Sequence, residues 1–224
     1  MGIKTWFVLF LIFFALPVGV FASVPEIGQS QISPASAGYF LKMVKEDIEL
    51  KLAQTDNVKF MRQMEFAVRR LREVKSLISE KREDLIEPNL IKYQDHIKKL
   101  ERYSSGNQDL QVLADERIAT HINLLISLYP NIKNTRAQLS IRAAVQNLEK
   151  RNRQEIKRLD KDLRAKVWGK TSLTQKLACE FLQKESTNSV LTQAEKKLVN
   201  IKAEECKEFL NNQLLESSPS SQYN

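Results

Sequence analysis

Residues 56–81 read DNVKFMRQMEFAVRRLREVKSLISEK, a stretch without glycine or proline. Apolar side chains recur along it at helical spacing and form a single stripe of Met61, Met64, Val68, Leu71, Val74 and Ile78. Elsewhere around the helix lie charged residues, among them Arg62, Arg69, Arg72 and Glu73. A period of about 3.6 residues is typical of an amphipathic helix with one face toward a core. The stretch therefore predicts a long helix, with Asp56 or Asn57 as its N-terminal cap.

The rest of the chain is equally poor in helix breakers. Between residues 39 and 218 the only glycines and prolines are Gly106, Gly169, Pro88 and Pro130. This is too few for a many-stranded β protein, and each lies between segments with helical spacing of apolar residues. We expect seven helices, at about 37–53, 56–81, 88–103, 109–129, 132–167, 172–186 and 192–211. The first carries one apolar face, formed by Leu41, Val44, Ile48 and Leu52.

The predicted fold is all-α, an elongated antiparallel helical bundle with one long helix and a C-terminal helical hairpin. The long helix is expected at 132–167, where about 50 Å of helix would contain no breaker, and Trp168-Gly169 would end it. The hairpin consists of 172–186 and 192–211, whose starts match capping boxes, Ser172-x-x-Gln175 and Thr192-x-x-Glu195. We expect Trp168 to pack at the joint between the body and the hairpin.

The N-terminal segment has the pattern of a secretory signal. Lys4 precedes an apolar run from Trp6 to Leu16. Val20-Phe21-Ala22, with side chains of small or moderate size at the positions that signal peptidase reads, precede Ser23. We expect cleavage after Ala22 and export of the mature chain, and the alternative is an uncleaved membrane anchor. The predicted organisation is a signal peptide at 1–22, a linker at 23–36, a helical domain at 37–168, the hairpin at 170–213 and a disordered tail at 214–224.

Cys179 and Cys206 are the only cysteines, and each helix of the predicted hairpin carries one of them. In a chain that reaches an oxidising compartment, we expect the two to form a disulfide. The bond would close a loop of about 27 residues and contribute on the order of 3 kcal/mol. The alternative interpretation is two buried free thiols.

The chain has a net charge of +8, and charged residues of both signs make up 28% of it. Charge is most uneven between Lys150 and Lys166, where basic residues form one stripe of Lys150, Arg153, Lys157, Lys161 and Arg164. This stripe is a candidate binding site for an anionic membrane surface or a cell-wall polymer, and the alternative is a solvated helix face. Nucleic acid is not expected as a partner, because a groove-reading motif and stacking aromatics are missing.

The residues do not assemble the pattern of a reaction site. The sequence has no nucleophile elbow and no phosphate-binding glycine loop, and its acidic residues are interleaved with Lys and Arg. His96 and His121 lie on separate predicted helices, without a second ligand at i+4. We therefore expect no catalytic residues, no cofactor and no metal.

Two segments resemble the motifs of a bacterial family of exported helical domains of unknown function. The first runs from Ser33-Pro34 through Tyr39-Phe40-Leu41-Lys42 to Glu46–Leu52, similar to a family opening of Ser-Pro, an aromatic and Leu-Lys. The second, Phe66–Val74, is similar to the family's Ala-x-x-Arg-Leu-x-Glu-Ala helix. The resemblance covers about residues 33–165. It implies interaction rather than chemistry, since some members stand beside or within extracytoplasmic regulators of sigma factors, and it carries over no functional residue.

A shorter match lies in Leu191-Thr192-Gln193-Ala194-Glu195, which is similar to the Leu-Thr-x-x-Gln motif of helical periplasmic stress chaperones, although a capping box explains the same residues. The leading hypothesis is a non-enzymatic exported protein that mediates protein–protein interaction in the bacterial envelope. The alternatives are a peripheral binder of anionic lipid or cell-wall polymer and a stress-type extracytoplasmic chaperone. Amphipathic stripes can be buried within one chain or across a dimer, so the oligomeric state stays open.

Overall fold

The structure, a computed structural model, describes residues 28–217, with side chains up to residue 214. The predicted signal peptide at 1–22, residues 23–27 of the predicted linker and residues 218–224 of the predicted tail lie outside the described residues. Residues 214–217, which were expected in a disordered tail, are helical. The described residues form helices and no strand, which confirms the all-α class. The helices are α2 (Tyr39–Lys51), α3 (Asp56–Ser79), α4 (Ile86–Ser104), α5 (Gln108–Leu128), α6 (Thr135–Arg158), α7 (Lys161–Glu185) and α8 (Gln193–Ser217). Two 3₁₀ turns, η1 (Glu83–Leu85) and η2 (Tyr129–Asn131), follow α3 and α5.

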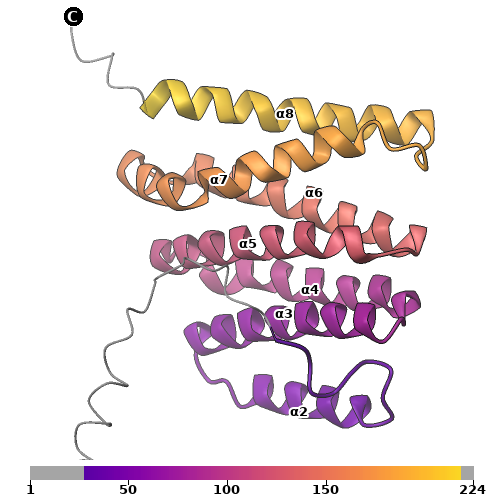
Figure 1. Cartoon of the computed structure of the whole chain (residues 1–224). Helices are drawn as coiled ribbons and strands as arrows, with labels where there is room; N and C mark the ends of the chain where they lie inside the picture. Colours follow the sequence, from indigo (N-terminus) through magenta and orange to yellow (C-terminus); the bar gives the residue numbers. More distant parts are fainter. Residues whose placement is uncertain (1–27, 218–224) are drawn as a thin grey trace, which may run out of the picture.

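The helices pack as three antiparallel hairpins stacked side by side (Figure 1). α3 pairs with α4, α5 with α6, and α7 with α8. The first helices of the hairpins contact one another in turn and form one layer, and α4, α6 and α8 form the second layer. α2 lies against α3 at one end of this stack, and α8 lies at the other end. The predicted antiparallel bundle with a C-terminal hairpin is therefore confirmed.

The main core lies between the layers and draws apolar side chains from all three hairpins. Its fully buried members include Phe60, Tyr93, Ile122 and Ile141. A smaller cluster, formed by Ile156, Leu159, Val167, Trp168 and Phe209, lies where α6, α7 and α8 meet. Trp168 packs edge-on against Phe209 there, with ring centroids 5.6 Å apart. Burial of these aromatic and aliphatic side chains is the main force that holds the hairpins together.

The prediction of a single long helix at 132–167 is wrong, because the helix is interrupted at Leu159. Leu159 and Asp160 have extended backbone angles, with ψ of 148° and 166°. The Asp160 side chain accepts a hydrogen bond from the Leu163 N–H at 2.9 Å and so caps α7. Any L-residue can adopt these angles, so the break needs neither glycine nor proline. The buried Leu159 side chain holds the bend in the smaller cluster.

Of the two capping boxes predicted at the starts of the last two helices, one is absent and one is present. α7 runs through Gly169 and Ser172 without interruption, so the capping box predicted at Ser172 does not form. The predicted border between 37–168 and 170–213 therefore falls inside a continuous helix. At α8 the predicted box is present, because Thr192 and Glu195 exchange hydrogen bonds through N–H groups and side chains. The cap of α3 is Thr55 rather than Asp56 or Asn57.

Candidate interaction surface

α2 turns polar side chains toward the body of the protein. Tyr39, Lys42 and Glu46 recur at intervals of three and four residues, and all three contact α3. Glu46 is buried, although it is a carboxylate on a helix that also carries two leucines and an isoleucine. Its partners on α3 are also charged and buried, since Arg70 and Glu73 are both 0% exposed. Charge rather than apolar packing therefore forms the contact between α2 and α3.

Arg70 links the two helices. Its guanidinium donates to the Glu46 carboxylate and to the Tyr39 hydroxyl, and lies 3.1 Å from Glu73 Oε2. Glu73 accepts a hydrogen bond from the Tyr39 hydroxyl at 3.0 Å and pairs with Lys42. Tyr39 also lies under a cation, because Lys92 Nζ of α4 is 4.8 Å from its ring centroid. We name Tyr39, Lys42, Glu46, Arg70 and Glu73 the ion network.

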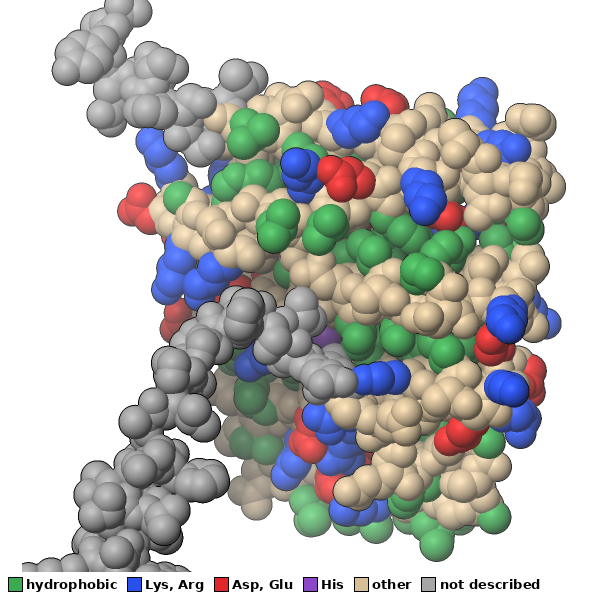
Figure 2. All heavy atoms as spheres, in the orientation of Figure 1, with side chains coloured by type: hydrophobic (Ala, Val, Ile, Leu, Met, Phe, Trp, Pro, Cys, Tyr) green, Lys and Arg blue, Asp and Glu red, His purple; other side chains and the backbone are tan. Residues whose placement is uncertain are grey.

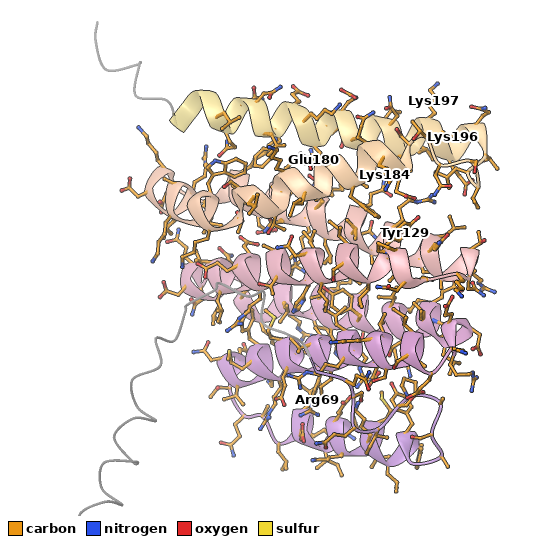
Figure 3. All side chains as sticks on the ribbon, viewed as in Figure 1. Arg69, Tyr129, Glu180, Lys184, Lys196 and Lys197 are labelled. Carbon is orange, nitrogen blue, oxygen red and sulfur yellow. A yellow bond between two sulfur atoms is a disulfide. The ribbon has the colours of Figure 1, made fainter. Side chains whose placement is uncertain are left out.

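Arg69 extends the ion network toward solvent. Figure 3 shows this residue on the side of α3 that faces α2. Its guanidinium lies 3.4 Å from Glu46 Oε1 and 3.2 Å from Glu49 Oε2. Arg69 also pairs with Glu65 at 2.5 Å, and together with the partly buried Lys42 it offsets the two buried carboxylates that surround Arg70.

The ion network fixes the rotation of α2 about its own axis. A buried charge that loses its partner costs about 3–5 kcal/mol, so Arg70 and Glu73 require the polar face of α2 to point inward. Burial raises the pKa of the Glu46 carboxyl, while Arg70 and Lys42 beside it act in the opposite direction. Burial and the charge on Glu73 raise the pKa of Tyr39, which keeps its hydroxyl protonated as a donor. With the polar face inward, the apolar face must point outward.

The outward side of α2 carries five large apolar side chains in solvent. Their exposed fractions are 71% for Phe40, 69% for Leu41, 39% for Val44, 50% for Ile48 and 74% for Leu52 at the C-cap. Figure 2 shows green apolar surface over the α2 end of the molecule. Other exposed large apolar residues include Leu173 and Leu177 on α7 and Leu198 and Ile201 on α8. We name the five α2 residues the α2 face, and it is the candidate functional site.

The sequence predicted the stripe of the α2 face but not its direction. Leu41, Val44, Ile48 and Leu52 share one side, as expected, yet that side faces away from α3. The ion network was missed altogether. A signal for it lies in the register of α3, where Arg70 falls between the buried Ala67 and Val74 at helical spacing. A charge at such a core position needs a buried partner of opposite sign.

The structure divides the predicted basic stripe between two helices. Lys150, Arg153 and Lys157 lie on α6, whereas Lys161 and Arg164 lie beyond the break, on α7. Arg153 is buried and binds Glu149 at 2.9 Å and Glu205 at 3.1 Å, so its charge is neutralised within the protein. Arg164 donates to the Leu159 carbonyl at 3.1 Å. The exposed members are the three lysines, and they do not share one helix.

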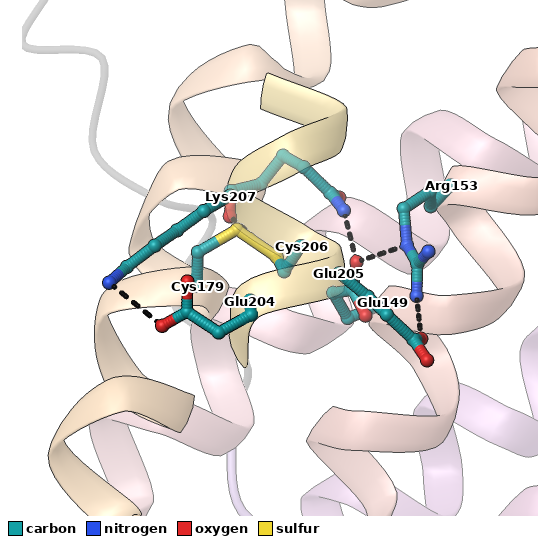
Figure 4. Close-up of a disulfide and its surroundings, with 8 residues drawn as sticks. Glu149, Arg153, Cys179, Glu204, Glu205, Cys206 and Lys207 are labelled. Carbon is teal, nitrogen blue, oxygen red and sulfur yellow. Dashed lines mark hydrogen bonds and ion pairs between the residues drawn. A yellow bond between two sulfur atoms is a disulfide. The ribbon is translucent and has the colours of Figure 1, made fainter. Parts of the chain in front are cut away.

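Cys179 and Cys206 form a disulfide between α7 and α8, as the sequence predicts (Figure 4). Their Cα atoms are 5.5 Å apart, and both residues are buried. The Glu149–Arg153–Glu205 group lies beside the bond and links α6 to α8. Gln175 of α7 donates a hydrogen bond to Glu149 at 2.7 Å. The last hairpin is thus joined covalently and by buried polar contacts.

The remaining titratable groups of interest are in separate places. His96 contacts Gln63 at 2.7 Å and His121 contacts the Tyr93 hydroxyl at 3.0 Å, and burial lowers the pKa of each histidine to about 4. Asp115 lines a polar cavity of about 170 Å³ between α4, α5 and α6, where burial and Glu155 raise its pKa to about 7. Within residues 28–217 no group of three His, Cys, Asp or Glu side chains is placed to hold a metal. In the same range, no helix is long and apolar enough to cross a membrane.

Comparison with known proteins identifies one family. Residues 31–166 match the model of a domain of unknown function, DUF5667, which spans α2 to the start of α7. No curated protein and no solved structure matches the chain. The two motifs that carry the resemblance in the sequence, one on α2 and one on α3, face each other across the ion network. Because the match covers more than half of the chain, the protein belongs to the DUF5667 family.

Proposed function

We propose that this member of the DUF5667 family is a non-enzymatic protein that binds another protein through the α2 face. The observation that carries the proposal is the inverted orientation of α2, with charges buried and large apolar side chains in solvent. Exposed apolar patches of several hundred Å² on a soluble protein usually mark interaction sites. A helix whose apolar residues recur at three- and four-residue spacing is also a common recognition element.

The ion network supports this proposal because it makes the apolar face a fixed feature. If α2 could rotate, Leu41 and Ile48 would pack on the core and the face would disappear. The pairs that Glu46 forms with Arg70 and that Lys42 forms with Glu73 oppose this rotation. The α2 face is therefore presented in one orientation before any partner arrives, which reduces the entropic cost of binding.

We also propose that the protein is exported, with cleavage after Ala22, and that it acts in the cell envelope or outside the cell. Support comes from the charged and apolar pattern of residues 1–22 and from the disulfide, since such bonds persist in oxidising compartments. The measurement is the N-terminal sequence of the protein recovered from its own cells. A first residue of Ser23 is expected. A chain that retains its initial residues and stays in the cytoplasm would contradict export.

Site-specific photo-crosslinking tests the binding function. A photoreactive residue at position 41 or 48 should give the same crosslinked partner in the protein's own cells. The matched control is position 173, because Leu173 is as exposed as Leu41, at 69%, but lies on α7. The double variant Leu41→Glu, Val44→Glu should abolish crosslinking from position 48. Equal yields from positions 48 and 173 would contradict the proposal.

The chaperone alternative would use the same face for many unfolded clients, so the crosslinking pattern separates the two. A discrete partner mapped to one segment favours a specific interaction. Many unrelated unfolded partners, together with suppression of client aggregation by the purified protein, would replace it with the chaperone function. The anionic-surface alternative would instead rest on the exposed lysines Lys150, Lys157 and Lys161. If the protein binds its partner through the α2 face, charge reversal at these lysines leaves crosslinking from α2 unchanged.

A further inference from the structure

We infer that the occupant of the α2 face is the α2 face of a second copy of this chain, paired antiparallel across a two-fold axis. The inference rests on the proposed function and specifies its partner. α2 lies at the end of the stack, and α3 covers its inner side (Figure 1). Within residues 28–217 the outer side is therefore exposed to another molecule. Two copies can meet there through α2 alone, with their bodies pointing away from each other.

The apolar residues of α2 suit self-pairing. A two-fold axis that passes between the two helices at the level of Ile48 places the two Ile48 side chains together. It sets Val44 of each copy opposite Leu52 of the other, because both residues lie four positions from Ile48. Leu41 and Phe40 extend this contact at each end, because Leu41 lies next to Leu52 of the other copy along the helix axis. In a two-fold interface the same patch serves both partners, so a self-complementary order of side chains is the requirement. Antiparallel helices also bring opposite ends of their dipoles together.

Charge along the two edges of the α2 face points to a second copy rather than to an anionic surface. One edge carries Lys45 and Glu49, whose carboxylate also lies 3.2 Å from Arg69 of α3, and the other carries Asp47 and Lys51. Across the same two-fold axis, Lys45 approaches Glu49 of the second copy, and Asp47 approaches Lys51. Each edge therefore carries charges in the order base, acid, acid, base, with each base beside an acid of the other copy. A membrane-surface helix would instead carry mainly Lys and Arg along its edges.

The area of the α2 face agrees with a weak dimer. The five side chains leave on the order of 500 Å² of apolar surface exposed on each copy, comparable to the largest patches on soluble monomers. Two copies would bury roughly 1,000 Å² in all, close to the lower limit for a specific interface. We therefore expect a dimer that forms reversibly, with a dissociation constant in about the micromolar range.

Sedimentation of the purified mature chain across a concentration series tests dimerisation. The wild-type protein should pass from monomer to dimer, and the Leu41→Glu, Ile48→Glu double variant should raise the dissociation constant at least about a hundredfold. The Leu173→Glu control, with equal initial exposure, should leave it unchanged. Circular dichroism verifies that each variant is folded. A monomer at every concentration, or a dimer insensitive to the double variant, would overturn the inference.

Cysteine crosslinking tests the antiparallel arrangement. The chain's two cysteines are joined to each other, so an introduced thiol is the only reactive one. The Ile48→Cys variant should form a covalent dimer on mild oxidation. A mixture of the Val44→Cys and Leu52→Cys variants should crosslink to each other, whereas neither should crosslink alone. Efficient crosslinking of the Val44→Cys variant with itself would indicate a parallel pair and overturn the proposed arrangement.

The outcomes distinguish this inference from the proposed function. A monomer whose α2 face still crosslinks to one different protein in cells would overturn self-pairing and leave the binding function intact. A monomer without such crosslinks would overturn both. Cosedimentation with vesicles of phosphatidylglycerol and phosphatidylcholine, lost in the double variant and without any dimer in solution, would assign the face to a membrane surface and overturn the second copy as occupant.

Discussion

At the scale of single residues, Arg70 is the largest fully buried side chain in the described part of the protein. Its substitution Arg70→Leu would leave Glu46 and Glu73 buried without their main cation. We expect the free energy of unfolding to fall by about 3 kcal/mol. Urea denaturation followed by circular dichroism measures it. The neighbouring exposed residue provides the control, since Arg72→Leu should change the value by less than about 0.5 kcal/mol. Equal losses in the two variants would show that the ion network does not stabilise the fold.

The raised pKa of Asp115 predicts that its contribution to the free energy of unfolding falls as the pH rises. Burial and Glu155 raise the pKa of its carboxyl to about 7 in the folded protein, from an ordinary value of 3.8. Between these values the folded chain holds a proton that the unfolded chain releases, so this group's stabilisation is full below about pH 4 and is lost as the pH rises through 7. The Asp115→Asn variant should match the wild type at pH 4 and exceed its stability at pH 8, by on the order of 3 kcal/mol.

The same experiment contains an internal control for Asp115. Burial lowers the pKa of His96 and His121 to about 4, so their contribution has the opposite sign and falls as the pH drops from 6.5 to 4. Both proteins contain these histidines, so the difference between their unfolding free energies isolates the carboxyl. A difference that does not depend on pH would contradict the raised pKa of Asp115.

At the scale of the helix, the sequence identified the elements well and their contacts less well. The stripes of α3 and α4 predicted helices because burial there follows the 3.6-residue period, as for Leu71, Tyr93 and Leu100. α2 shows why the contacts of a helix can be harder to predict than the helix itself. Its apolar period is equally clear, but the direction of that face depends on Arg70 and Glu73, which lie more than twenty residues away on α3. The core position of Arg70 on α3 indicates a buried charge but does not identify its partner on α2, so the sequence predicted the apolar stripe and not its exposure to solvent.

The break between α6 and α7 was not predicted from the sequence for a different reason. The prediction of an unbroken helix rested on the absence of glycine and proline, and neither occurs at Leu159-Asp160. The cap formed by Asp160 is instead a single hydrogen bond to the Leu163 N–H. We expect Asp160→Ala to destabilise the protein by about 1 kcal/mol, since it removes this acceptor. Thermal unfolding measures the loss. Asp162→Ala, inside the first turn of α7, should cost less, and the reverse order would contradict the role of Asp160 as the cap.

At the scale of the whole molecule, the disulfide closes the hairpin at one end of the stack. Reduction, or the double substitution Cys179→Ala, Cys206→Ala, should lower the free energy of unfolding by about 2–4 kcal/mol. Hydrogen exchange should become faster mainly in α7 and α8, because stacked hairpins contact chiefly their neighbours. The α2–α3 contact, at the far end, serves as the reference. Equal acceleration throughout the stack would contradict local closure by the bond.

The stack is therefore fastened differently at its two ends. α7 and α8 are held by a covalent bond, whereas α2 is held by non-covalent ion pairs and hydrogen bonds. Opening of a linear stack starts at its weaker end, so a protease should first reach the chain beside α2. Any protein bound over α2 keeps that end closed. The lifetime of the molecule in a protease-rich compartment would then follow the concentration of its partner, and for a self-paired chain, its own abundance.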